Sequence, residues 1–230
     1  MKTFPLTRDL TLGWNLGNTL DAVPTAPMML PTDSETLWRN PVTTKSMIDA
    51  VKAAGFDVLR VPTTWDKHFT DAPDYAIDPR WLLRVREVVS YGLDNGMRVI
   101  LNMHHEGWHF PSAENKQAAL DKITALWTQI ANEFNDVGDE LIFEGLNEPR
   151  MKGTPLEWQG GTEEARAIIA DYCLAFVAAV RATGGNNKTR RLMVTGSGAS
   201  TDEKVLASIR LPENDKNIIV SVPPGSSAKG

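Results

Sequence analysis

A carboxylate and an amide lie side by side near the end of segment 141–149, which reads LIFEGLNEP. A short apolar run of this kind is typical of a parallel strand that is buried on both faces. Because Pro149 cannot donate to a sheet ladder, we expect the strand to end there, with Asn147 and Glu148 at its carboxyl end, where α/β folds place active sites. An apolar wall disfavours the charged form of a carboxyl group, so Glu148 is a candidate general acid; the alternative is a solvated glutamate.

Polar and aromatic residues also follow two other predicted strands, 56–61 and 98–103. In a barrel of parallel strands the carboxyl ends open into one mouth, so we expect these residues to be neighbours in space. Arg60 has an alternative role as the partner of a buried carboxylate. The residues grouped in this way are Arg60 and Trp65 from the first strand end, and Asn102, His104, His105, Glu106 and Trp108 from the second.

The adjacent histidines His104 and His105 are candidate metal ligands. Neighbouring residues of a strand point to opposite faces, so at most one of the two is expected to face the mouth. Adjacent histidines without a spaced third ligand indicate zinc only weakly, and we expect no metal and no other cofactor. His68 and His109 lie in predicted loops and are assigned no role.

The seven tryptophans favour one class of ligand. Trp81 and Trp127 lie on predicted helices and are expected in the core. An exposed indole offers a flat apolar face that suits a sugar ring, so tryptophans beside an acid and amides favour a carbohydrate cleft. No glycine-rich phosphate motif competes with this interpretation. The tryptophans in predicted loops are Trp38, Trp65, Trp108 and Trp158.

Predicted strands and helices alternate along the chain. Glycine and proline separate apolar runs of strand length from segments with helical periodicity. The strands are expected at 10–17, 56–61, 98–103, 141–149, 191–195 and 217–222, and the helices at 43–54, 80–95, 116–134, 162–182 and 202–209, with a long loop at 22–40. This alternation predicts an α/β fold, an incomplete TIM-like (β/α) barrel of about six parallel strands that lacks strands seven and eight. One domain is expected over 1–222, with a disordered tail at 223–230.

Composition narrows the range of partners. A net charge of −5 over 230 residues argues against nucleic acid and anionic membranes as partners. The single Cys173 excludes an intramolecular disulfide and, within an apolar helical run, is expected to be a buried, unreactive thiol. No apolar run reaches the roughly 18 residues of a membrane span, and the N-terminus lacks the apolar core of a signal peptide.

Five motifs together resemble glycoside hydrolase family 5 cellulases, endo-β-1,4-glucanases with a (β/α)8 barrel and a retaining mechanism. The motifs run in family order over about residues 10–222. They are GWNLGNTLD (13–21), WRNPVTT (38–44), GFDVLRVP (55–62), NMHHE (102–106) and FEGLNEP (143–149).

The resemblance implies roles for the residues at the predicted mouth. Glu148 is implied as the catalytic acid/base and Asn147 as a contact of the sugar 2-hydroxyl. Arg60 and His104 are implied to orient the nucleophile and the cleft. The expected substrate-binding residues are Asn18, His105, Trp65 and Trp108. The resemblance also implies a parent protein that is secreted.

The sequence departs from the family pattern after residue 222. In the family, strand six leads into a His-x-Tyr pair, strand seven ends in the nucleophilic glutamate, and a stacking tryptophan follows strand eight. Retention needs two carboxyl groups about 5 to 5.5 Å apart, and only Glu148 is identified. Glu106 and Glu144 are candidates for the second carboxyl group, but a structural role is favoured for each of them. Strand parity places Glu144, Leu146 and Glu148 on one face, with Glu144 deeper and paired with Arg60.

The sequence therefore predicts a hydrolase of internal β-1,4-glucosidic bonds in cellulose or related β-glucans. The alternatives are a catalytically impaired remnant that binds β-glucan, and a related hydrolase of mannan or xyloglucan. The expected partner is a β-glucan polysaccharide. An open barrel leaves two edge strands unpaired, so we also expect a homo-oligomer that covers the open edges.

Overall fold

The computed structural model describes residues 5–25 and 30–222. Six parallel strands form one sheet in which each strand pairs with the next along the chain. The strands are β1 (Gly13–Asn15), β2 (Val58–Val61), β3 (Arg98–Asn102), β4 (Leu141–Glu144), β5 (Leu192–Val194) and β6 (Ile218–Val220). The predicted α/β fold with six parallel strands is confirmed, and the predicted tail at 223–230 lies outside the described residues.

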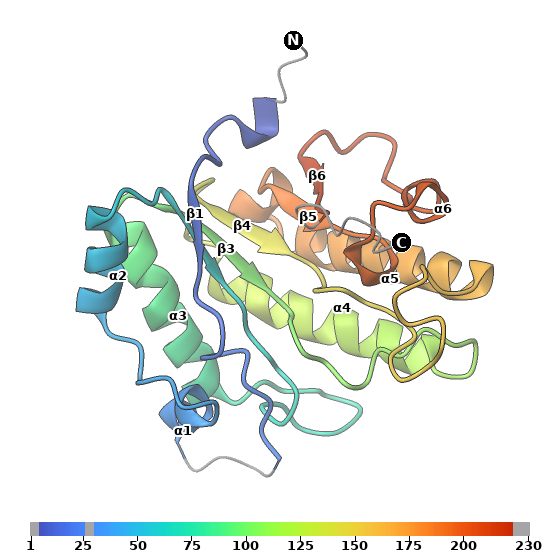
Figure 1. The fold of residues 1–230 in the computed structure, drawn as a ribbon, viewed down its shortest axis with the longest axis horizontal. Helices are drawn as coiled ribbons and strands as arrows, with labels where there is room; N and C mark the ends of the chain where they lie inside the picture. Colours follow the sequence, from blue (N-terminus) through green and yellow to red (C-terminus); the bar gives the residue numbers. More distant parts are fainter. Residues whose placement is uncertain (1–4, 26–29, 223–230) are drawn as a thin grey trace.

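Helices connect the strands and cover the outer side of the curved sheet (Figure 1). Three of them begin at side-chain caps that the sequence provides. Asp78 accepts from the Arg80 N–H (2.8 Å), Thr162 from the Ala165 N–H (3.1 Å) and Asp202 from the Lys204 N–H (3.0 Å). No helix among the described residues is long and apolar enough to cross a membrane. The helices are α1 (Pro31–Thr36), α2 (Lys45–Ala53), α3 (Pro79–Asp94), α4 (Lys116–Glu133), α5 (Glu163–Ala182) and α6 (Glu203–Leu206).

The short helix α1 corrects the prediction of a loop over 22–40. Proline suits the first helical turn because the N–H that it lacks would be unpaired there. Glu35 within α1 is fully buried and accepts hydrogen bonds from the Arg84 guanidinium on α3, the shorter at 2.7 Å. Six residues are too few to show helical periodicity, so the sequence pattern could not reveal this helix.

The core has two parts. The larger lies between the sheet and the helices and contains Trp81 and Trp127, as predicted. The smaller lies on the opposite face of the sheet and is formed by Val58, Ile100 and Ile142. Cys173 is buried as expected, and desolvation raises the pKa of its thiol to about 11.

A buried arginine fixes the turn that leads into β4. The Arg190 side chain lies over the Phe143 ring and donates to five acceptors, none of which is a carboxylate. These acceptors are the carbonyl oxygens of Phe134, Val137, Gly138 and Leu141 and the side-chain oxygen of Asn187. One side chain thus satisfies several buried carbonyl groups between α4 and β4.

Strand β4 ends earlier than predicted, at Glu144 and not at Pro149. Gly145 packs so closely on Phe176 that an added Cβ would clash with the ring. Leu146 then enters the larger core beside Phe143, so the predicted parity of Glu144, Leu146 and Glu148 is wrong. The segment that carries Glu148 is therefore a loop, whose direction strand alternation does not determine.

Candidate active site

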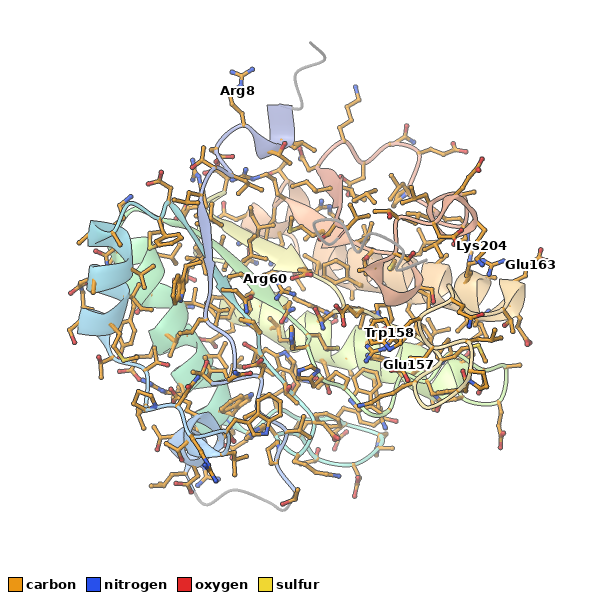
Figure 2. The ribbon with its side chains drawn as sticks, in the orientation of Figure 1. Arg8, Arg60, Glu157, Trp158, Glu163 and Lys204 are labelled. Carbon is orange, nitrogen blue, oxygen red and sulfur yellow. The ribbon has the colours of Figure 1, made fainter. Side chains whose placement is uncertain are left out.

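Arg60 on β2 links the polar residues at the carboxyl ends of the strands (Figure 2). Its Nε donates to Glu144 Oε2 at 2.7 Å and its Nη2 donates to Glu144 Oε1 at 3.1 Å. Nη2 also donates to Asn147 Oδ1 at 2.9 Å, and Nη1 donates to Asn15 Oδ1 at 2.9 Å. The predicted pairing of Arg60 with Glu144 is confirmed, and the same guanidinium orients the Asn147 amide.

Asn102 at the end of β3 extends this network to His104. Its Oδ1 accepts from the Thr63 N–H at 3.1 Å. Its Nδ2 lies 3.2 Å from Glu144 Oε2 and 2.9 Å from His104 Nδ1. Burial, the positive charge of Arg60 and the neighbouring His105 lower the pKa of His104 to about 2, so its ring is neutral at physiological pH.

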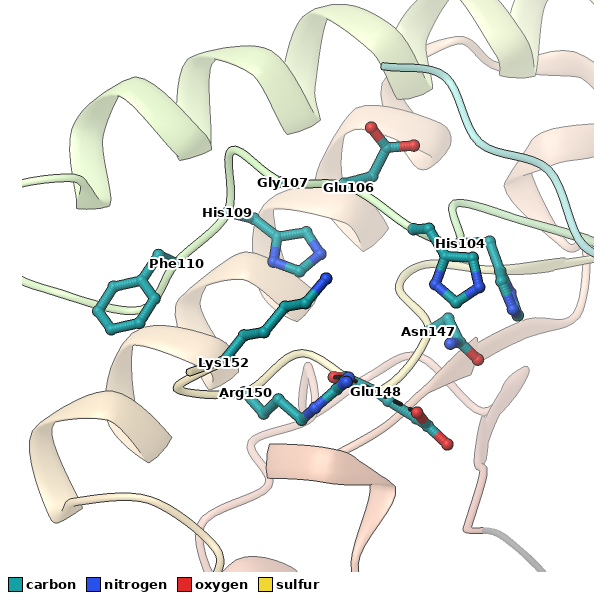
Figure 3. A pocket seen from close by; sticks show the side chains of 10 residues that line it. His104, Glu106, Gly107, His109, Phe110, Asn147, Glu148, Arg150 and Lys152 are labelled. Carbon is teal, nitrogen blue, oxygen red and sulfur yellow. Dashed lines mark hydrogen bonds and ion pairs between the residues drawn. The ribbon is translucent and has the colours of Figure 1, made fainter. Parts of the chain in front are cut away.

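A pocket opens beside this network and has a cavity volume of about 50 Å³. Figure 3 shows Asn147 between His104 and Glu148. The residues that line the pocket are His104, His105, Glu106, Gly107, His109, Phe110, Asn147, Glu148, Arg150 and Lys152. The structure thus brings together His104, Asn147 and Glu148 as predicted, and Arg60 contacts Asn147.

The surroundings of Glu148 differ from the predicted apolar wall. Its backbone φ is +36°, and its side chain is 37% exposed. Arg150 Nη1 lies 3.6 Å from Glu148 Oε2 and donates to the Glu148 carbonyl oxygen at 3.0 Å. The early end of β4 explains this, because Glu148 stands on a turn at the pocket opening and not on the buried strand.

Both adjacent histidines line the pocket, contrary to the prediction that at most one would face the mouth. Strand β3 ends at Asn102, so alternation does not apply to His104 and His105, whose ring centroids are 4.4 Å apart. His109, to which no role was assigned, lines the same pocket. Its Nε2 is buried and makes no hydrogen bond to any residue within 5–25 and 30–222, and burial lowers the pKa of the ring to about 4.

Two tryptophans that are predicted to bind sugar, Trp65 and Trp108, instead make contacts within the protein. Trp65 is fully buried in the core, and its Nε1 donates to the Asn102 carbonyl at 3.1 Å, so the prediction of an exposed indole is wrong. Trp108 is half-buried, packs on the core and donates from Nε1 to Glu106 Oε2 at 2.8 Å. The exposed indoles among the described residues are instead those of Trp14, Trp38 and Trp158. The Trp38 ring centroid is 5.7 Å from that of His105, and Trp158 lies under the Arg150 guanidinium.

Asn18 lies on the loop that follows β1. Its side chain is exposed, its φ is +62°, and its carbonyl oxygen accepts from Asn40 Nδ2 at 3.0 Å. Asn40 also donates to the Gly17 carbonyl at 3.1 Å and so fixes this loop. The role of Asn18 in sugar binding stays a prediction.

Glu106 is directed away from Glu148 (Figure 3). Its carboxyl group accepts from the Trp65 backbone N–H at 2.6 Å and from Trp108 Nε1 at 2.8 Å, which joins the loops after β2 and β3. Desolvation raises the pKa of Glu106 to about 8 and outweighs these two donors. Glu106, like Glu144, is engaged in contacts that hold the site together, as its favoured structural role requires.

Asp21, His104 and His105 form a group of potential metal ligands in the described part of the chain. Their candidate ligand atoms lie within 4.8 Å of one another. His104 Nε2 is 3.9 Å from Asp21 Oδ2, and Asp21 Oδ1 accepts from the Thr19 N–H at 2.8 Å. The sequence did not reveal Asp21, because it precedes the histidines by more than 80 positions and shares no motif with them.

Comparisons with known proteins agree on one family. The sequence profile described as Cellulase (glycosyl hydrolase family 5) matches residues 22–222. Endoglucanase A of Ruminococcus albus is 51% identical over 211 residues, which cover 91% of this chain and 57% of that protein. Endoglucanase B of Clostridium cellulovorans is 49% identical over 216 residues, which cover 94% and 47%.

A solved structure shows the same architecture. The GH5-4 broad specificity endoglucanase from Ruminococcus champanellensis with bound cellotriose has a TM-score of 0.91 and 48% identity, over 94% of this chain and 64% of that one. The chain thus spans about half the length of the curated relatives it matches.

Proposed function

The chain belongs to glycosyl hydrolase family 5, and we propose that it hydrolyses internal β-1,4-glucosidic bonds in cellulose or related β-glucans. The observation that supports the proposal is the convergence of Asn147, Glu148 and His104 on one pocket, with Arg60 bonded to Asn147. These are the positions for which the family motifs imply catalytic and sugar-binding roles.

Glu148 is the proposed general acid/base. Its partly exposed carboxyl group at the pocket opening can protonate the leaving glycosidic oxygen and then remove a proton from the attacking water. Arg150 Nη1, 3.6 Å from Glu148 Oε2, can stabilise the carboxylate between these two steps.

Asn147 is the proposed contact of a sugar hydroxyl. A guanidinium only donates, so the Asn147 atom 2.9 Å from Arg60 is its oxygen. The amide nitrogen is then left for the pocket, where it can donate to a hydroxyl oxygen of the substrate. Arg60 thereby sets which end of the amide the substrate meets.

No nucleophile is identified among the described residues. The Glu106 carboxyl group accepts from the Trp65 N–H and from Trp108 Nε1, and Glu144 is held by Arg60 with its side chain only 8% exposed. Both carboxyl groups are thus committed to other contacts. This observation favours a second candidate function for the 230-residue chain by itself, namely β-glucan binding with little turnover.

Reducing-end release from soluble β-glucan, with cellotriose binding measured in parallel, separates the two candidates. A hydrolase loses its signal in the Glu148→Gln variant by about a hundredfold or more, and Glu213→Gln is the matched control at an exposed carboxyl group that does not line the pocket. A binding protein gives no signal in any variant but retains cellotriose. Equal release by the unmodified chain and Glu148→Gln would show that Glu148 is not the acid. Xyloglucan and mannan serve as parallel substrates.

A further inference from the structure

The contacts of the Asn102 side chain determine which of its two ends is oxygen. The Thr63 backbone N–H can only donate, so the Asn102 atom 3.1 Å away is Oδ1. The Glu144 carboxyl group accepts two hydrogen bonds from Arg60 and acts as an acceptor toward Asn102 as well, so the Asn102 atom 3.2 Å from Glu144 Oε2 is Nδ2. Two independent partners assign the same orientation, and Asn102 is fully buried, so water does not compete for either end.

This orientation determines where His104 carries its proton. Nδ1 of His104 lies 2.9 Å from the donating Nδ2 of Asn102, so Nδ1 has to be the acceptor. A neutral imidazole with an accepting Nδ1 carries its hydrogen on Nε2. Within residues 5–25 and 30–222, Nε2 makes no hydrogen bond, because Asp21 Oδ2 at 3.9 Å is beyond bonding distance.

We propose that Asn102 is a positioning residue that fixes His104 as the Nε2–H tautomer, so that His104 and Asp21 together bracket one hydroxyl group of the ligand. Nε2–H donates to the hydroxyl oxygen, and the hydroxyl hydrogen is donated to Asp21 Oδ2. Two atoms 3.9 Å apart can both lie about 2.8 Å from one oxygen placed between them. The identity of this hydroxyl as one of a β-glucan rests on the proposed function, whereas the tautomer does not.

The fixed tautomer also argues against a metal at Asp21, His104 and His105. A metal at His104 Nε2 would move the ring proton to Nδ1, where it would face the Nδ2 donor of Asn102. Metal-binding histidines instead donate their second ring N–H to a carboxylate, a carbonyl or water. The candidate ligand atoms lie within 4.8 Å of one another. However, the residue that contacts His104 Nδ1 is Asn102, which presents a donor where a metal-binding histidine needs an acceptor.

NMR of the histidine ring nitrogens in the full chain tests the tautomer directly. The His104 signals are assigned as those lost in a His104→Gln variant. The unmodified protein is expected to show His104 with a protonated Nε2 and an unprotonated Nδ1. In Asn102→Asp a carboxylate of the same shape replaces the donating amide, and the proton is expected to move to Nδ1. Asn15→Asp adds the same charge beside Arg60 without touching His104 and is expected to leave the tautomer unchanged.

A protonated Nδ1 or a mixture of tautomers in the unmodified protein would overturn the proposal, and this holds even if Asn102→Asp does not fold. A folded Asn102→Asp protein whose His104 keeps its proton on Nε2 would overturn it as well. Circular dichroism establishes which variants are folded.

Cellotriose titration separates this inference from the proposed function. Asn102→Asp is expected to bind cellotriose about tenfold more weakly, or about 1.4 kcal/mol, because the hydroxyl oxygen then meets a ring lone pair. No binding by the unmodified chain would contradict the proposed function but leave the tautomer result valid. Equal binding by the two proteins, after the tautomer has moved, would show that His104 does not contact the ligand and would overturn the hydroxyl site.

Discussion

Replacement of Arg60 by methionine is expected to lower the free energy of unfolding by about 3–5 kcal/mol, because it leaves the Glu144 carboxylate buried without its cation. That carboxylate accepts two hydrogen bonds from Arg60, at 2.7 and 3.1 Å, and one from Asn102 at 3.2 Å. The Glu144 side chain is 8% exposed, so water cannot replace the guanidinium. Methionine keeps most of the apolar stem of arginine, so the loss reports mainly on the charge pair.

A double-mutant cycle isolates the pair. Glu144→Gln is expected to cost about 1–3 kcal/mol, since Arg60 keeps its acceptors on Asn15 and Asn147. The variant carrying both changes should be more stable than the summed single effects predict, by about 0.5–3 kcal/mol. Urea unfolding followed by circular dichroism gives all four values. The control Arg80→Met breaks an exposed pair with Asp78 and should cost no more than about 1 kcal/mol. Additive single effects, or a loss near the control value for Arg60→Met, would refute the view that Arg60 and Glu144 are a buried, coupled pair.

Three further predictions concern stability and assembly. Glu106 has a folded pKa of about 8 against an ordinary value of 4.5, so the folded state binds more protons between these values and stability falls as pH rises through this window. Urea unfolding across this range should show a slope of stability against pH that Glu106→Gln lacks; equal slopes contradict the assignment. Arg190→Met should cost more than about 3 kcal/mol, since it leaves several buried carbonyls unpaired, whereas the exposed Arg210→Met should cost about 1 kcal/mol or less; similar losses in urea would contradict this. Light scattering of the 25.4 kDa chain at micromolar concentration should give a larger mass, because β1 and β6 each pair on one side within the described sheet; a monomer mass would contradict this.

The order of the strands and longer helices could be predicted because apolar runs and helix-ending glycines mark them. Gly55 and Gly96 adopt positive φ at the ends of α2 and α3, a conformation that glycine allows without strain. The pairing of Arg60 with Glu144 was also predictable, because both lie on strands whose alternation directs them to the same side. Regular periodicity thus predicts the order of the strands and helices, and also the part of the site that is formed by strand residues.

The parts of the site that lie on loops could not be predicted in this way. Glu148 has a positive φ and its direction follows from the turn after β4, which no hydrophobic pattern encodes. His104 and His105 both face the pocket because β3 ends before them. Trp65 is drawn into the core by tertiary packing, whereas its sequence position alone suggested an exposed loop. The Glu106 contacts that link two loops need three-dimensional information for the same reason.

The central claim is that the pocket beside β3 and β4 binds β-glucan through Asn147 and His104, with Glu148 at its opening. An NMR titration of the chain with cellotriose, which follows the Asn147 side-chain amide and the His104 Nε2–H, tests this claim most directly. We expect saturable shifts of both signals, with those of the Asn135 amide, which follows α4 and contacts Thr183, unchanged. Saturable binding that leaves the Asn147 and His104 signals unmoved, or no binding at all, would contradict it.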